Sequence, residues 1–328
     1  MKRSASLSRN LAVSLVLAAA FHGNTYAQSS VQTTGPYKAV MEMVPSLQKH
    51  TIYRPENLAA VKGKLPVVAW GNGACASVGN SFQNYLTEFA SYGFLVIASG
   101  PIDPNFHFPS AAEMQKMAQA ANNSSGTGGS AAPAMRMPTE RTTTKQLFEA
   151  MDWAKAQNED KSSPYFGKID VGAIAVAGQS CGGLEALEAA ADPRVKTVVV
   201  VNSGIMRNPG AIPAPPGAAP IVIPGSVASL TKLHTPTIYL IGGEKDIAYK
   251  NAEADFAAIT TVPLFKANLD VGHGGTLAEP HGGKFAGVAT QWLLWQLKHD
   301  NKAGQMFVGE KCGLCQQPEW KVERKNMK

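Results

Sequence analysis

Short apolar runs bounded by turn residues recur along the chain and predict strands that are buried in the fold. They lie at 65–70, 94–98, 173–177, 197–201 and 237–241. The run at 197–201 contains only β-branched residues, which is typical of a strand that is covered on both faces of its sheet. The pattern therefore favours a central sheet with a layer on each side.

Apolar residues with helical spacing fill the intervals between these runs. The helical segments are 82–90, 142–157, 284–298 and one that begins near Leu184. Two further strands are predicted at 51–53 and 264–271. Alternation of strands and helices predicts an α/β fold with a mostly parallel central sheet and helices on both faces.

Two irregular stretches interrupt this alternation. Residues 111–121 are compatible with a helix, but the following segment to 133 is rich in Asn, Ser, Gly and Ala, and 207–224 is dense in Pro, Gly and Ala. Such compositions are typical of loops. Loops of this kind commonly form the walls of a binding pocket.

The first 27 residues have the pattern of a secretory signal peptide. Lys2, Arg3 and Arg9 form a basic start, 11–21 is apolar but too short to span a bilayer, and small residues precede Ala27. We expect cleavage after Ala27 and an exported protein, periplasmic or extracellular, with no membrane association; an uncleaved anchor is the alternative. Loss of three basic residues lowers the net charge from +6 to +3, which does not indicate a nucleic-acid partner.

The segment Gly178-Gln179-Ser180-Cys181-Gly182-Gly183 lies between a predicted buried strand and a predicted helix. A serine in such a strand–turn–helix connection is lifted above the sheet edge by a strained backbone. Flanking glycines allow the turn to approach its neighbours closely. We therefore predict that Ser180 is a catalytic nucleophile. The alternative is a glycine-rich turn with a solvated serine.

A serine hydroxyl needs a base to remove its proton, and the base needs an acid to orient it. His273 follows the last predicted strand within a glycine-rich loop, so we assign it as the base, with His281 as the reserve; His299 ends a helix. Asp246 and Glu244 both follow the strand at 237–241. We assign Asp246 as the acid, because it lies far enough past the strand for a loop to turn its carboxylate toward His273.

The oxyanion formed in acyl transfer needs two donors. We predict the backbone N–H groups of Cys181 and Asn72, the latter in the turn after the strand at 65–70. Trp70, His107 and Gln179 adjoin the same rim in sequence and are assigned to substrate binding. A packed or solvated loop histidine is the alternative for His107.

The four cysteines allow three pairings, and export favours disulfides. Cys75 and Cys181 flank the predicted donors, so a disulfide between them would hold the oxyanion hole in shape. Cys312 and Cys315 are expected to form a local disulfide. They lie in a polar C-terminal tail, 301–328, which follows a domain that spans 28–300. Free thiols are the alternative for both pairs.

No metal or cofactor is expected. Cys312 and Cys315 are only half of a zinc site. The segment 71–76 resembles a dinucleotide fingerprint, but no convincing acid for binding a ribose follows it.

Together these residues resemble the α/β-hydrolase superfamily, and within it the secreted polyesterases (cutinase-like and PET-hydrolase-like enzymes) and the dienelactone-hydrolase group. The likeness runs from about Pro66 to Leu297. The segments that carry it are Gly71-Asn72, 90–97, Tyr165-Phe166-Gly167-Lys168-Ile169-Asp170, Gln179-Ser180-Cys181-Gly182-Gly183, Pro236-Thr237 and Glu244-Lys245-Asp246. The resemblance implies an α/β-hydrolase fold and the triad Ser180, Asp246 and His273.

Polyesterases differ from this chain in the spacing of Cys312 and Cys315 and at two further places. They carry an aromatic residue where Asn72 stands and a second one after the strand at 197–201, where this chain has Asn202-Ser203-Gly204. The expected function is therefore a serine hydrolase of carboxylic esters, small or polymeric, and the departures weigh against polyesters. A peptidase or amidase on the same triad, a non-catalytic binding module and a cofactor-binding oxidoreductase are the alternatives.

Overall fold

The computed structural model describes residues 31–106, 108–109, 113, 116, 140–208 and 222–327. The predicted signal peptide, His107 and most of the two predicted irregular stretches lie outside these described residues.

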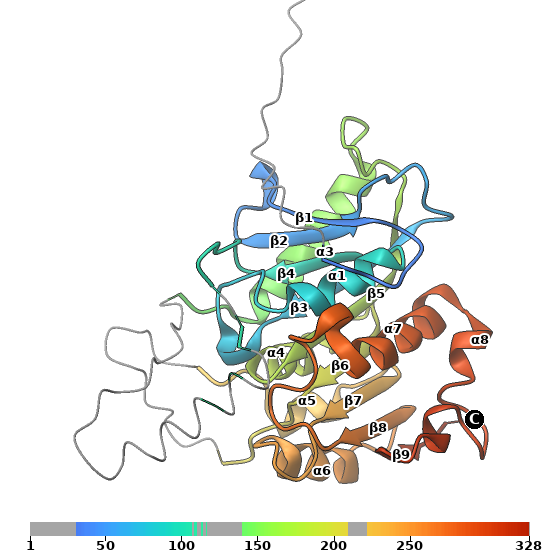
Figure 1. Ribbon diagram of the computed structural model, residues 1–328. Coiled ribbons are helices and arrows are strands. Elements are labelled where there is room, and N and C mark those ends of the chain that lie inside the picture. Colours follow the sequence, from blue (N-terminus) through green and yellow to red (C-terminus); the bar gives the residue numbers. More distant parts are fainter. Residues whose placement is uncertain are drawn as a thin grey trace, which may run out of the picture.

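A nine-stranded sheet forms the centre of the molecule, in the order β1-β2-β4-β3-β5-β6-β7-β8-β9 (Figure 1). The strands are β1 Ala39–Glu42, β2 His50–Pro55, β3 Leu65–Gly71, β4 Leu95–Ser99, β5 Ile169–Gln179, β6 Val195–Val201, β7 Thr237–Ile241, β8 Leu264–Leu269 and β9 Trp320–Lys325. From β4 to β8 neighbouring strands pair in parallel, whereas β1, β2 and β9 pair antiparallel at the two edges. The carboxyl ends of the parallel strands therefore meet along one edge.

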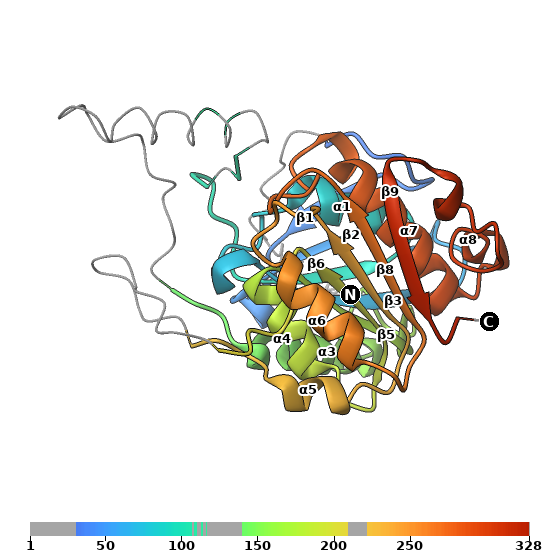
Figure 2. The same ribbon diagram turned by 90° about the horizontal axis from the view of Figure 1, so that it is seen from below.

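Helices cover both faces of this sheet (Figure 2). They are α1 Gln83–Ser91, α3 Thr144–Glu159, α4 Cys181–Ala189, α5 Val227–Thr231, α6 Tyr249–Ala258, α7 Gly283–Lys298 and α8 Asn301–Gly304. Short 3-10 turns are η1 Pro45–Leu47, η2 Gly73–Cys75, η3 Pro280–Gly282 and η4 Leu314–Gln316. Helices α1 and α7 lie on one face, and α3, α4, α5 and α6 on the other. The predicted α/β fold is confirmed.

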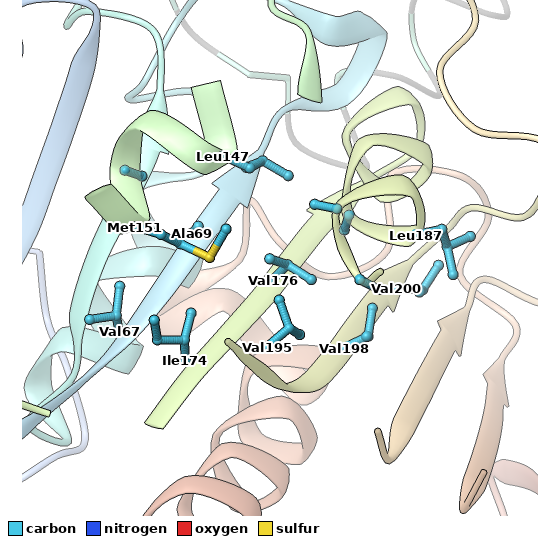
Figure 3. Close-up of a cluster of buried hydrophobic side chains, with 14 of the residues drawn as sticks. Val67, Ala69, Leu147, Met151, Ile174, Val176, Leu187, Val195, Val198 and Val200 are labelled. Atoms are coloured by element: carbon cyan, nitrogen blue, oxygen red, sulfur yellow. The ribbon is translucent and has the colours of Figure 1, made fainter. Parts of the chain in front are cut away.

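Alternation along the strands divides the apolar side chains between two cores. In β3, Val67 and Ala69 belong to the core under α3 and α4, whereas Val68 and Trp70 belong to the core under α1 and α7. Figure 3 shows the first core, where Met151 of α3 packs over β3 and β5. Burial on both faces explains why the central strands read as unbroken apolar runs.

The C-terminal segment is part of the sheet, although its polarity predicted a separate tail. Strand β9 pairs with β8. Its first residue, Trp320, is buried, and the next residue, Lys321, is exposed. Phe307 and Cys312 are also buried in the core under α7. An edge strand needs only one buried face, so alternating polar residues are compatible with it. Strand β1 and helix α6 were likewise not predicted.

Within the part of the chain that the structure describes, no helix has the length and apolar character needed to cross a membrane.

Candidate active site

Ser180 occupies the turn between β5 and α4 with a backbone that non-glycine residues rarely adopt. Its φ is 53° and its ψ is −118°. A side chain on Gly178 would collide with the Gly182 carbonyl, and one on Gly182 would collide with the Gly71 carbonyl. The glycines thus let strand, turn and helix pack closely, and the strained turn raises the Ser180 hydroxyl at the carboxyl edge of the sheet.

The three residues predicted as a triad lie within hydrogen-bond distance of one another. His273 Nε2 is 3.0 Å from Ser180 Oγ, and His273 Nδ1 is 2.6 Å from Asp246 Oδ1. With the proton on Nδ1 donated to Asp246, Nε2 is the acceptor that faces the serine O–H. Ser180 follows β5, Asp246 follows β7 and His273 follows β8, so the shared strand edge brings them together.

The Asp246 carboxylate is enclosed by donors. Oδ1 accepts from the N–H of Ala248 at 2.9 Å in addition to His273, while Oδ2 accepts from Asn202 Nδ2 at 2.6 Å and from the N–H of Gly242 at 3.1 Å. Burial by itself raises the pKa of Asp246, but the hydrogen bonds from His273, Ala248 and Asn202 outweigh it and hold that pKa below its ordinary value. The acid therefore stays ionised beside the imidazole.

Asn202 was not predicted from the sequence, although it holds the acid. It directly follows β6 with a φ of 45° and also donates through Nδ2 to the Gly272 carbonyl at 3.1 Å, just before His273. Its neighbour Ser203 donates to the Ser180 carbonyl at 2.6 Å. A usable signal was present, because a polar residue directly after a fully apolar central strand lies on the same edge as the triad.

The reserve residues lie elsewhere. His281 is only partly buried, and its Nδ1 is 2.7 Å from the Gln32 carbonyl. His299 is the exposed C-cap of α7. The Glu244 side chain is 74% exposed and faces Lys321 at 3.8 Å. Of the candidate bases and acids, the structure brings only His273 and Asp246 to Ser180.

Both predicted disulfides are present. Cys75 bonds to Cys181 with a Cα–Cα separation of 5.1 Å, and Cys312 bonds to Cys315. Cys181 is the first residue of α4, and Cys75 ends the turn η2. The first bond therefore ties the turn after β3 directly to the residue that follows the nucleophile.

The segment before α3 holds the same turn. Arg141 Nη1 donates to the Ala74 carbonyl at 2.8 Å, and the N–H of Thr142 donates to the Cys75 carbonyl at 2.7 Å. Ala74 and Cys75 have φ values of 54° and 49°, which turn the chain back toward Ser180. Several contacts thus fix a backbone that is strained at two consecutive non-glycine residues.

Two cavities meet at Ser180. The smaller one, of about 200 Å³, has Leu184, Met206 and Ile223 in its wall, and we name it the aliphatic cavity. The larger one, of about 350 Å³, has Phe82, Phe106 and Phe108 in its wall, and we name it the aromatic cavity. Four residues line both: Ala74, Ser180, Ile247 and His273. A molecule held at Ser180 thus has space on two sides of the hydroxyl.

Asn72, the predicted oxyanion donor, does not line either cavity. It is fully buried, and its Nδ2 donates to the carbonyls of Ala76, Val78 and Ser99 at 3.1, 2.9 and 2.6 Å. Its side chain therefore fixes the path of the loop from beneath. The residue of this turn that faces both cavities is Ala74, two positions further along the chain.

The three residues assigned to substrate binding have different surroundings. Trp70 does not line a cavity: it is fully buried, donates to Asn72 Oδ1 at 3.0 Å and packs against Phe82 at 5.7 Å between ring centroids. Gln179 lines the aromatic cavity and donates to the His273 carbonyl at 3.0 Å. His107 lies outside the described residues.

Glu185 is a buried carboxyl behind the site. Its Oε1 accepts from Thr142 Oγ1 at 2.9 Å, whereas its Oε2 has no hydrogen-bond partner among the described residues. Burial raises the pKa of Glu185 to about 7; the Thr142 bond opposes this shift and nearby Glu188 adds to it.

No group of three or more His, Cys, Asp or Glu side chains within the described ranges is placed to hold a metal ion. Comparisons with models of known protein families and with curated proteins found no match for the chain.

Proposed function

We propose that the protein is an exported serine hydrolase of the α/β-hydrolase superfamily that cleaves carboxylic esters through an acyl-enzyme. One observation carries the proposal. Ser180 Oγ lies 3.0 Å from His273 Nε2, on a strained turn with a φ of 53°, at the junction of two apolar cavities. A solvated serine in an ordinary turn has no need of an oriented imidazole and a buried, fully hydrogen-bonded carboxylate behind it.

In the first half-reaction, His273 takes the proton of Ser180 as Oγ attacks the ester carbonyl carbon. Asp246 stabilises the imidazolium that forms, and its four donors keep it ionised in a buried position. His273 then gives the proton to the leaving alcohol oxygen, and the acyl group remains on Ser180. This order requires the imidazole tautomer that the Asp246 bond favours.

The oxyanion faces two backbone donors. Cys181 is the first residue of α4, where an N–H has no partner within the helix and the helix dipole is positive. The second donor is the N–H of Ala74 rather than that of Asn72, because Ala74 lines both cavities and Asn72 lines neither. The Cys75–Cys181 disulfide joins these two segments and limits their relative movement.

In the second half-reaction, water enters beside Ser180 and gives its proton to His273 as it attacks the acyl carbon. The bond to Oγ breaks, the carboxylic acid leaves and the proton returns to Ser180. The sequence pattern of residues 1–27 and the two disulfides support export to a periplasmic or extracellular location.

Kinetics on a panel of short esters and matched amides test this proposal. Ser180→Ala and His273→Ala should each lower kcat by about a thousandfold or more, because triad members act as a unit. His281→Ala is the matched control for the base, and Glu244→Gln is the control for Asp246→Asn. Both controls should keep activity near that of the wild type.

Near-wild-type ester turnover by the Ser180→Ala protein would refute the assignment of the nucleophile. Faster turnover of the amides than of the esters would replace the esterase proposal with an amidase. A folded protein that turns over neither class would support the binding-module alternative.

A further inference from the structure

Three phenylalanine rings give the aromatic cavity a chemistry that the aliphatic cavity lacks. Phe82, Phe106 and Phe108 line it together with Gln179 and Gly274, and it opens directly onto Ser180. Phe82 and Phe108 lie 4.6 Å apart between ring centroids at an angle of 52°. Rings in such tilted geometry present both faces and edges, which is how aromatic groups bind one another.

The walls of this cavity are held in place by contacts behind them. Phe82 is 2% exposed and packs edge-on against the buried Trp70. Phe106 follows a loop that Asn80 fixes, because Asn80 Nδ2 donates to the Asp103 carbonyl at 2.9 Å and Asn80 Oδ1 accepts from the Asp103 N–H at 2.9 Å. The Phe82 ring is thus supported by a buried ring behind it, and the loop that leads to Phe106 is held by two hydrogen bonds with Asn80.

The catalytic geometry distinguishes the two cavities. The leaving oxygen must receive its proton from His273, whereas the oxyanion faces the N–H of Cys181. Cys181 lines the aliphatic cavity, and Gly274, the neighbour of His273, lines the aromatic cavity. Ala74, Ser180 and His273 line both cavities, so the distinction rests on Cys181 and Gly274. On that basis the acyl chain is assigned to the aliphatic cavity, on the side of Cys181, and the alcohol group to the aromatic cavity, on the side of Gly274.

We propose that the substrates are esters of short carboxylic acids with alcohols that carry an aromatic ring; this rests on the proposed function. A cavity of about 150 Å³ is enough to hold benzene. The aromatic cavity, of about 350 Å³, has room for one ring and its linking carbon, and its lining is almost wholly apolar. The aliphatic cavity, of about 200 Å³, suits a short acyl chain.

The reaction is ester hydrolysis, and His273 carries the proton in both of its steps. Oγ of Ser180 bonds to the acyl carbon, the bond to the aromatic alcohol breaks, and His273 passes the serine proton to the leaving oxygen. Water then supplies the oxygen of the free acid, and its proton returns through His273 to Ser180. One ester and one water yield one carboxylic acid and one aromatic alcohol.

A matched substrate pair tests the proposal on the full mature chain. Benzyl acetate and cyclohexylmethyl acetate differ in the aromaticity of the ring and have leaving alcohols of similar size and acidity. Tilted ring contacts should favour benzyl acetate by about tenfold in kcat/KM. Phe106→Leu keeps an apolar side chain but removes one of the three rings, and it should lower the ratio by several-fold. Phe166→Leu, at an exposed phenylalanine that lines neither cavity, is the matched control and should leave the ratio unchanged.

A second pair places the ring on the acyl side. Methyl phenylacetate should be no better a substrate than methyl cyclohexylacetate, because the described residues that line the aliphatic cavity include no phenylalanine, tyrosine or tryptophan. A ratio near one for the acetates, or an aromatic preference only in the acyl pair, would overturn the inference and leave the esterase proposal intact. If Ser180 were not required for the turnover of any ester, both the esterase proposal and this inference would be overturned.

Discussion

Glu185 provides a test of the packing behind the active site that is independent of catalysis. The side chain is fully buried one turn into α4, and its Oε2 lies against the backbone of Gly71, where no donor reaches it. The perturbation is Glu185→Gln, which keeps the shape and the acceptor for Thr142 but removes the titrating proton.

The magnitude follows from the pKa of Glu185, which rises from 4.5 to about 7. Because this pKa is raised, the folded protein keeps the proton up to about pH 7, whereas the unfolded chain releases it near pH 4.5. The stability that the protonated carboxyl contributes is complete below pH 4.5 and is lost as the pH rises through 7. A shift of this size corresponds to about 3 kcal/mol.

Urea unfolding of the disulfide-intact protein, followed by tryptophan fluorescence between pH 4.5 and pH 8, measures the effect. The unfolding free energy of Glu185→Gln, relative to the wild type, should rise by up to about 3 kcal/mol across this range. Glu310→Gln, at an exposed position outside α4, is the control, and its difference from the wild type should stay flat. A flat difference for Glu185→Gln as well would show that Glu185 does not keep its proton in the folded state.

Two further predictions concern the residues that position the triad and its turns. Asn202→Ala should lower kcat by about a hundredfold through misplacement of the acid, with KM little changed, and Asn202→Asp should not restore it, because a carboxylate cannot donate. Replacing Cys75 and Cys181 by serine should cost about 2–5 kcal/mol of unfolding free energy in chemical denaturation. Replacing Cys312 and Cys315 should cost clearly less, because that disulfide joins residues only 3 apart in sequence against 106 for the first; equal losses would contradict the loop-closure argument.

The main features of the site could be predicted because each triad residue follows a strand that the sequence pattern predicts. Parallel strands place their carboxyl ends on one edge of the sheet. Ser180, Asp246 and His273 follow β5, β7 and β8, which lie close together in the strand order, so the three residues meet at that edge. The disulfide from Cys75 to Cys181 follows from the same reasoning, since the turns after β3 and β5 are neighbours on that edge.

Which residues of the turn after β3 face the cavities depends on backbone conformations that cannot be predicted from the sequence pattern. Left-handed φ values at Ala74 and Cys75, both non-glycine residues, direct Ala74 and not Asn72 into the cavities. Trp70 lies on the face of β3 that α1 and α7 cover, because side chains alternate along a strand. Its role is to support Phe82, and this depends on how α1 packs over the sheet.

The C-terminal strand was missed for a different reason. Strand β9 carries the exposed Lys321 and Glu323 between more buried positions and ends in Arg324 and Lys325, and such polarity resembles that of a solvated tail. Only the pairing with β8 distinguishes an edge strand from a tail, and that pairing is a tertiary contact.

The most direct test of the central claim is covalent labelling of the mature protein with a fluorophosphonate, followed by proteolysis and mass spectrometry of the peptides. One equivalent of the phosphonyl group should be found on Ser180, with none on Ser203, which follows the neighbouring strand β6, and prior reaction with a substrate ester should slow the labelling. Absence of a label on Ser180 in a folded protein, or a label on another serine, would contradict the account.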